Sequence, residues 1–381
     1  MTTDQAAAAA PATSRPGTAA RPVRGLPALL ERLFTALTAR PVSLYAASVL
    51  RIGYGLCYLA FLLREFTHRD QIWGPDSPWT PALAKELFQQ TGWFSFLTVS
   101  DSMLYFNACY VFALVVCALF LLGWRTRLTS VLFAMVVAAF HARAIFMTDG
   151  GDNLILLMAL YLTCTACGRR WSLDARRTAR RERGGPPSHW TLWQASSDLW
   201  SQFGAARGTL VTALHNCAML VIAAQVCLLY GSAGLYKVQG VSWQNGTALH
   251  YVMNLDLFRP WPALSALVDS HPLFVAVAGY ATVLIQVAFP FALFSRLKYV
   301  LLVMLLGMHL GIAVLMGLPM FSGAMLIADA AFLPDRFYLA VGQYCRRAFR
   351  GRPDSPAKGA ASAPSAVVPP RPGGAELAGR R

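Results

Sequence analysis

Long apolar stretches alternate with short polar breaks along most of this chain. A bilayer core about 30 Å thick takes about 20 helical residues to cross, and in hydrocarbon the backbone has to satisfy its own hydrogen bonds. These stretches therefore predict transmembrane helices, and the predicted fold class is an all-α polytopic membrane protein. We expect about eight spans, at approximately residues 42–64, 103–123, 128–147, 153–168, 209–236, 272–295, 299–318 and 320–334.

The amino-acid composition supports this interpretation and excludes an ordinary soluble domain. Only 13% of the residues are charged and 56% are hydrophobic, whereas soluble domains are about a quarter charged. The formal net charge of +15 raises the alternative of a nucleic-acid partner. The placement of the charges decides between the two.

The basic residues collect in alternate connections between the predicted spans. The rich side holds the N-terminal arm, Arg125 with Arg127, the stretch 169–183, Arg296 with Lys298, and the C-terminal tail. The positive-inside rule assigns that side to the cytoplasm. We therefore expect a multi-pass protein of the plasma (cell) membrane with both ends inside, whose partner is the lipid bilayer and not nucleic acid.

The predicted spans define three parts of the chain. Residues 1–24 lack the apolar core of a signal peptide and are expected to form a disordered cytoplasmic arm. Residues 25–335 form the predicted transmembrane domain, which the basic loop 169–207 divides into two bundles of four spans. Residues 336–381 are expected to be a basic, mostly disordered cytoplasmic tail.

Three further segments have the pattern of interfacial elements. Residues 25–40 place leucines and a phenylalanine on one helical face, as in a helix that lies along the membrane surface. The loops 65–102 and 237–271 are too polar to span but are rich in tryptophan and other aromatic residues, which favour the headgroup level. We expect both loops to be ordered at the outer face.

Ionisable residues within spans are the first candidates for function, because a charge in lipid is costly. Arg51 lies about ten residues into the first span and needs a polar cavity, a backbone carbonyl or Asp329 as its partner. His309 lies in the middle of a span, and His141 lies in the outer part of another. Either histidine could be an interhelical hydrogen-bonding group or could relay protons.

The segment GSAGLYKVQGVSWQNG (231–246) combines several signals. The small residues 231–234 allow a neighbouring helix to approach closely. Lys237 then follows at the outer boundary of the span, six residues before Trp243. Lys237 is either a membrane anchor beside an interfacial tryptophan or a desolvated lysine that can act as a base.

Two other motifs have simpler explanations beside the functional ones. Asp149 and Asp152 in a glycine-containing turn could hold a cation, but turn chemistry alone accounts for them. Cys164 and Cys167 form a C-x-x-C motif within an apolar helix, where packing competes with metal or redox chemistry. No second ligand pair has zinc spacing, so we predict no metal site.

Four segments together resemble the HTTM (horizontally transferred transmembrane) family, which is similar to the membrane part of vitamin K-dependent gamma-carboxylase. The resemblance covers about residues 40–335. The segments are LRIGYG (50–55), the Gly-Gly-Asp-Asn turn (150–153) leading into GRRWSLDARR (168–177), AGLYKVQGVSWQNG (233–246) and MHLGIAVLMGLPMFSGAML (308–326).

The resemblance implies specific roles. In the carboxylase an Ala-Gly-x-x-Lys segment followed by Trp-x-x-Gly supplies a base that deprotonates vitamin K hydroquinone at the extracytoplasmic face, and Lys237 falls on that base. It implies that Lys237 and His309 are catalytic. We expect Arg51 and Trp243 to bind the cofactor, which by resemblance is a reduced lipoquinone.

Departures from the carboxylase pattern keep a second hypothesis open. An Asn-Asn-His stretch of the carboxylase is replaced here by Gly151, Asp152 and Asn153, and only a basic tail follows the membrane part. The alternative is a non-enzymatic membrane partner in the export or maturation of a secreted peptide or protein, as for family members linked to a sporulation-delaying toxin.

Overall fold

The computed structural model of the chain describes residues 26–184 and 197–349, and all regular secondary structure in these ranges is helical. The predicted all-α class is therefore confirmed for the described chain. The chain divides after Asp335 into two units. The predicted N-terminal arm lies outside the described residues.

Within residues 26–184 and 197–349, five helices are long and apolar enough to cross a membrane. The prediction of about eight spans is therefore confirmed only in part. The five are α2 (Leu44–Arg64, continued by the 3-10 turn η1, Glu65–Thr67), α5 (Met103–Leu122), α9 (Ser197–Gln239), α13 (Pro272–Ala292) and α14 (Leu297–Leu315).

The other three predicted spans fall on shorter or more polar helices. Two are short apolar helices, α7 (Gly150–Thr163) and α15 (Pro319–Asp329, continued by η6, Ala330–Phe332). The third, α6 (Thr126–Arg143), carries arginine near its start and His141 and Arg143 in its last turn. The polar residues at its two ends lower the mean hydropathy of the whole helix.

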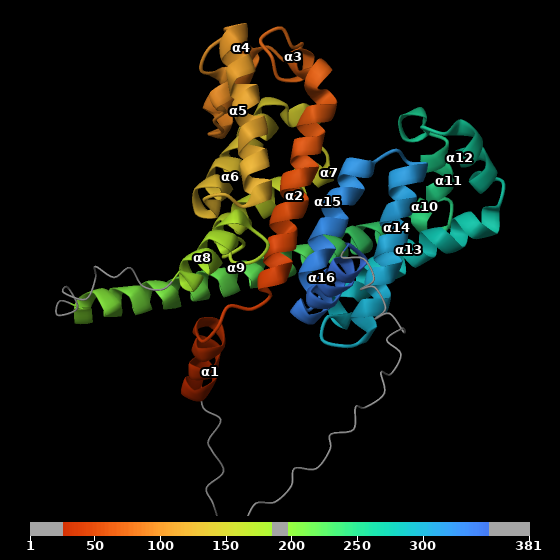
Figure 1. Cartoon of the computed structure of the whole chain (residues 1–381). Coiled ribbons are helices and arrows are strands. Elements are labelled where there is room, and N and C mark those ends of the chain that lie inside the picture. The colour runs from red at the N-terminus through yellow and green to blue at the C-terminus, as the bar shows by residue number, and fades with distance from the viewer. Residues whose placement is uncertain (1–25, 185–196, 350–381) are drawn as a thin grey trace, which may run out of the picture. The chain divides into compact units, whose positions relative to one another are not determined.

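Helix α9 begins twelve residues before the predicted span, at Ser197. Its 43 residues correspond to a length of about 65 Å, which is roughly twice the thickness of the bilayer core. Its first turns therefore belong to the basic connection and not to the span. Figure 1 shows α9 as a long continuous helix.

The helices of residues 26–335 pack in two groups that α15 connects. In the first group α2 packs against α5, α5 against α6, and α6 against α7; in the second, α13 packs against α9 and α14, and α14 against α15. Helix α15 also contacts α2 and α7. A Cβ atom at Gly53 of α2 would lie 2.7 Å from the Cγ2 atom of Ile327, so the absence of a side chain at Gly53 lets α2 and α15 approach.

Short helices occupy the segments predicted as interfacial, which are therefore ordered. The residues 25–40 become α1 (Leu26–Thr38), and the basic connection contains α8 (Leu173–Arg183). The remaining short elements are α3 (Arg69–Ile72), α4 (Pro81–Thr91), η2 (Phe96–Thr98), η3 (Ile145–Met147), α10 (Val241–Gln244), α11 (Ala248–Met253), η5 (Asp256–Phe258) and α12 (Pro262–Asp269).

The C-terminal unit opens with a helix that the sequence did not predict. Helix α16 spans Asp335–Phe349, although we expected the tail to be mostly disordered. The arginine-rich sequence suggested a solvated tail, but its apolar residues repeat with helical spacing. The rest of the predicted tail lies outside the described residues.

Candidate functional site

A buried hydrogen-bonded network joins three helices of the second group. The hydroxyl group of Tyr230 on α9 lies 3.0 Å from the Nε2 atom of His309 on α14 and 3.0 Å from the Oδ2 atom of Asp329 on α15. All three side chains are buried. Since the tyrosine donates its proton to the carboxylate, its oxygen is left to accept one from Nε2 of the histidine.

Aromatic packing holds this network in place. The ring of Tyr230 meets Phe289 of α13 edge to face, with centroids 5.2 Å apart, and Phe289 packs in the same way on Phe332. The ring of His309 lies against Phe321, at a centroid distance of 6.0 Å. Such edge contacts fix ring orientation, so the polar atoms of the network have little freedom to turn away.

Several buried polar atoms on the surrounding helices have no hydrogen-bond partner among the described residues. They are Nδ1 of His309, Oδ1 of Asp329, Oγ of Ser322 and Oε1 of Gln286. A buried polar atom without a partner costs free energy, so each one calls for an explanation such as a ligand or a catalytic role. With the proton on Nε2, the Nδ1 atom of His309 is free to accept a proton.

The side chains of Lys237 and Trp243 lie close together, as expected from their positions in the segment 231–246. The Nζ atom of Lys237 lies 5.3 Å from the centre of the Trp243 ring and donates a hydrogen bond of 3.4 Å to the carbonyl oxygen of Ala233. The lysine is half-buried. A cation above a tryptophan ring suits an anchor and a positioned base equally well, so the catalytic role remains a prediction.

The lysine and the buried network lie on the same face of α9. Lys237 follows Tyr230 by seven residues, which is two helical turns or about 10 Å along the axis. Between them, Gly234 gives α13 a close approach, because a Cβ atom there would lie 2.7 Å from Cγ2 and 2.9 Å from the backbone nitrogen of Val287. The close packing expected from the small residues 231–234 is thus present at Gly234.

Arg51 holds the first group of helices together through the backbone. It is fully buried, and its guanidinium group donates hydrogen bonds of 2.9 Å and 2.8 Å to the carbonyl oxygens of Phe120 and Leu121 and of 2.7 Å to that of Trp171. The last carbonyls of a helix have no partner within it, and Arg51 supplies one at the end of α5. Arg51 was expected to pair with a backbone carbonyl, with Asp329 or with a polar cavity. It pairs with backbone carbonyls, whereas Asp329 accepts its hydrogen bond from Tyr230.

The structure therefore does not connect Arg51 with the other predicted site residues. None of its three carbonyl partners belongs to the helices that carry Lys237 and His309. These contacts give its guanidinium group a structural task.

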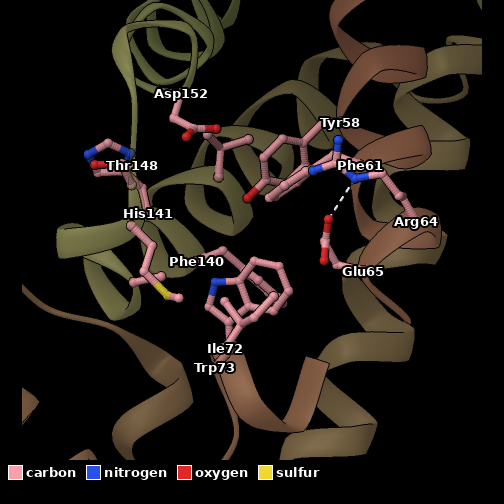
Figure 2. A pocket seen from close by; sticks show the side chains of 13 residues that line it. Tyr58, Phe61, Arg64, Glu65, Ile72, Trp73, Phe140, His141, Thr148 and Asp152 are labelled. Atoms are coloured by element: carbon pink, nitrogen blue, oxygen red, sulfur yellow. Dashed lines mark hydrogen bonds and ion pairs between the residues drawn. The ribbon is translucent and has the colours of Figure 1, made fainter. Parts of the chain in front are cut away.

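A small cavity lies in the first group of helices, around residues that include the second candidate histidine. Its volume is about 220 Å³, and Figure 2 shows its lining. Trp73 and Phe140 pack edge to face at one side, with centroids 5.3 Å apart. Arg64 and Glu65 form an ion pair with an N–O distance of 2.6 Å, and His141 lines the cavity as well. The sequence indicates His141 as a candidate but not this assembly, because α3 and α6 are distant in the chain.

The aspartates of the glycine-containing turn have a structural role in the start of α7. The carboxylate of Asp149 accepts hydrogen bonds from the backbone nitrogens of Gly151 and Asp152, at 2.6 Å and 3.0 Å, and the carboxylate of Asp152 accepts one from the backbone nitrogen of Asp149. This reciprocal arrangement is a capping box. It supports the turn explanation of these two carboxylates.

Tyr230 is the residue of the network that the sequence does not single out. His309 and Asp329 are ionisable residues within predicted spans, but a tyrosine in an apolar helix looks like an ordinary core residue. Its position seven residues before Lys237 was the available signal. The partners on α14 and α15 are far away in sequence and could not be inferred from it.

These features define a helical membrane protein with a buried polar network between its helices. Comparison with known proteins finds a similarity to YitO, an uncharacterized protein of Bacillus subtilis strain 168, with 26% identity over 211 residues. The aligned region covers 54% of this chain and 59% of YitO, so this chain spans less than two thirds of that relative. No family model matches the chain. No solved structure matches it either.

Proposed function

We propose that this chain is an HTTM-type membrane enzyme that transfers a proton from a reduced lipoquinone, with Lys237 as the base. The observation that carries the proposal is the Tyr230–His309–Asp329 network on the same helical face as that lysine. A histidine and a carboxylate buried between apolar helices are costly, and in membrane proteins such groups mark ligand sites and proton paths.

The residues present are suited to such a cofactor. Trp243 offers an aromatic surface beside the amine of Lys237, at 5.3 Å, and Gly240 keeps that surface close to the helix end, since a Cβ atom there would lie 3.0 Å from the Trp243 ring. A reduced lipoquinone supplies an acidic ring hydroxyl proton when bound. Arg51 has no part in this proposal, because its guanidinium group is bound to three carbonyl oxygens.

The network would serve the lysine as a proton acceptor. After Lys237 takes a proton, it has to lose it again before the next turnover. The free Nδ1 atom of His309 can take up a proton while Nε2 releases one to the oxygen of Tyr230, and Tyr230 passes its own hydroxyl proton to Asp329, so that no net charge stays on the histidine ring. Transfer over two helical turns needs intermediates such as water molecules.

We also infer the orientation with both ends in the cytoplasm of the cell. The structure brings the basic connections of the first helix group to one end. There the carboxylate of Asp174 on α8 accepts a hydrogen bond from the backbone nitrogen of Arg125, and the side chain of Arg51 donates one to the backbone carbonyl of Trp171. The positive-inside rule then places this end in the cytoplasm and Lys237 at the opposite face.

The proposal is tested by the small molecules that remain bound to the purified protein. The protein is purified in mild detergent, and its extract is analysed for lipoquinones by mass spectrometry beside an unrelated protein from the same membrane. We expect enrichment for the wild type, reduced in Trp243→Ala and kept in Trp261→Ala, a matched change at an exposed aromatic residue. No enrichment in the wild type would contradict the proposal and would favour the non-enzymatic alternative.

A further inference from the structure

A second and larger cavity lies at the end of the first helix group where α6 and α8 begin. Its volume is about 850 Å³. Four arginines line it: Arg125, Arg127, Arg169 and Arg170. We call it the arginine cavity. Two acidic residues, Asp174 and Glu182, also line it, so four positive charges face two negative ones.

Asp174 forms part of the framework of the cavity. Its carboxylate accepts hydrogen bonds from the backbone nitrogens of Arg125 and Thr126, at 3.0 Å and 2.7 Å, and from the hydroxyl group of Thr126, at 2.7 Å. Partial burial opposes its ionisation, but these hydrogen bonds outweigh burial and lower the pKa of Asp174. The carboxylate is thus charged at neutral pH and directed at the start of α6.

The arginine side chains keep their charge available to a ligand. Arg125 lies over the ring of Trp124 at 5.1 Å, and Arg170 lies over the ring of Tyr45 at 5.6 Å. Ring contacts of this kind hold a guanidinium group in place without neutralising it. Over residues 26–184 and 197–349, no ion pair involves any of the four arginines of the cavity.

We propose that the arginine cavity binds a phosphate group, such as that of an anionic phospholipid headgroup. Guanidinium groups bind phosphate oxygens in pairs and are the preferred ligands for this group. The cavity lies at the end that the arginine distribution assigns to the cytoplasm, where anionic lipids are concentrated and basic pockets between helices bind their headgroups. A soluble phosphate compound has the same chemistry, and the experiment separates the two sources.

The test compares two pairs of substitutions that remove the same charge. Arg169→Ala with Arg170→Ala changes the cavity, whereas Arg180→Ala with Arg181→Ala changes the exposed side of α8, outside the cavity lining. Each protein is placed in nanodiscs of phosphatidylglycerol and phosphatidylcholine, and retained lipids are counted by native mass spectrometry. In detergent, thermal stability is measured with and without inorganic phosphate.

We expect the wild type and the Arg180/Arg181 variant to retain phosphatidylglycerol selectively. The cavity variant should retain at least about tenfold less, because it loses charge-assisted hydrogen bonds. Stabilisation by inorganic phosphate in the wild type and the Arg180/Arg181 variant but not in the cavity variant, without lipid selectivity, would support the phosphate site with a soluble source.

Equal lipid retention and an equal response to phosphate in all three proteins would overturn the proposal. If the alanine variant is not monodisperse on size-exclusion chromatography, Arg127→Gln replaces it, because this residue lines the cavity from α6. The same outcomes then apply.

Discussion

The hydroxyl oxygen of Tyr230 lies 3.0 Å from the Oδ2 atom of Asp329, and this bond joins α9 to the end of α15 in a buried setting. Helix α15 also packs against α2 through Gly53, and the hydroxyl group of Tyr54 donates to the carbonyl oxygen of Ala324 at 3.0 Å. The two helix groups are therefore coupled through α15, and the carboxylate of Asp329 lies at the end of that helix.

Replacing Tyr230 with phenylalanine should destabilise the protein by about 1–3 kcal/mol, because a buried carboxylate loses its donor. Thermal unfolding in detergent, followed by intrinsic fluorescence, measures the change. Tyr236→Phe is the matched control, since that side chain is on the same helix and is 81% exposed. Equal unfolding temperatures for Tyr230→Phe and the control would show that the bond contributes nothing.

Gly234→Val should weaken the packing of α9 on α13. The added Cβ atom would lie 2.9 Å from the backbone nitrogen of Val287, which cannot move aside as a side-chain end can. Overpacking of this kind costs about 1–3 kcal/mol, so we expect a lower unfolding temperature. Gly208→Val on the same helix, where nothing lies within 4 Å of the Cβ position, should change stability little; an equal loss there would point to helix propensity and not to packing.

Acidification should remove the contribution of Asp174 to stability. Hydrogen bonds from Thr126 and Arg125 outweigh the opposing effect of burial and lower the pKa of Asp174 in the folded state. A carboxyl group with a lowered pKa stabilises the fold above its unfolded pKa of about 4, and this stabilisation is lost as the pH falls through the folded value. The wild type should therefore unfold at a higher temperature than Asp174→Asn at neutral pH.

The difference between these two proteins should shrink as the pH is lowered below about 4. Unfolding temperatures measured across this range provide the check. A difference that stays constant would show that the asparagine variant is destabilised for reasons other than the charge of Asp174.

Accessibility to labelling should follow the orientation we infer. In a protein without its native cysteines, Arg180→Cys on α8 should react with a membrane-impermeant maleimide only after permeabilisation. Glu86→Cys on α4 should react in intact cells. Both positions are exposed, so access to the reagent depends on the side of the membrane. Reaction of the α8 position in intact cells would contradict the orientation.

The sequence predicted helices well and their partners poorly. Apolar runs gave five membrane-length helices, because hydropathy over 20 residues is a local property. The predicted span 128–147 falls on α6, whose apolar middle lies between Arg127 and Arg143, and these two residues lower the mean hydropathy of the helix. The predicted span begins at about residue 209, inside α9, since the helix extends into polar sequence that hydropathy does not report.

In the candidate site too, contacts between residues close in sequence could be predicted, whereas contacts between distant residues could not. Lys237 and Trp243 are close in sequence, and their contact could be anticipated. Arg51 was correctly expected to need a partner, but its carbonyl partners follow from where α5 ends beside α2, which is a long-range feature. The partners of His309 depend in the same way on the packing of α9 and α15 against α14.

The substitution Lys237→Arg distinguishes a base from an anchor. Any long cation can hold a helix end at the membrane surface, and arginine can also lie over Trp243. A guanidinium group does not release its proton in a protein, so arginine cannot serve as a base. If Lys237 is the base, the arginine variant should reach normal membrane abundance but lose the function that deletion of the protein removes, and Lys237→Ala should lose that function too. Full function in the arginine variant would establish the anchor.

Lys298→Arg is the matched control for this comparison. Lys298 lies at the start of α14 with its Nζ atom 5.3 Å from the centre of the Tyr299 ring, so it makes the same kind of contact as Lys237 at the end of another apolar helix. Nothing in its surroundings suggests catalysis, and arginine should replace it with abundance and function unchanged. A loss of function in both lysine-to-arginine variants would mean that the geometry of a cation on a ring matters at either helix end. A loss confined to Lys237 would then reflect the proton that only lysine can give up.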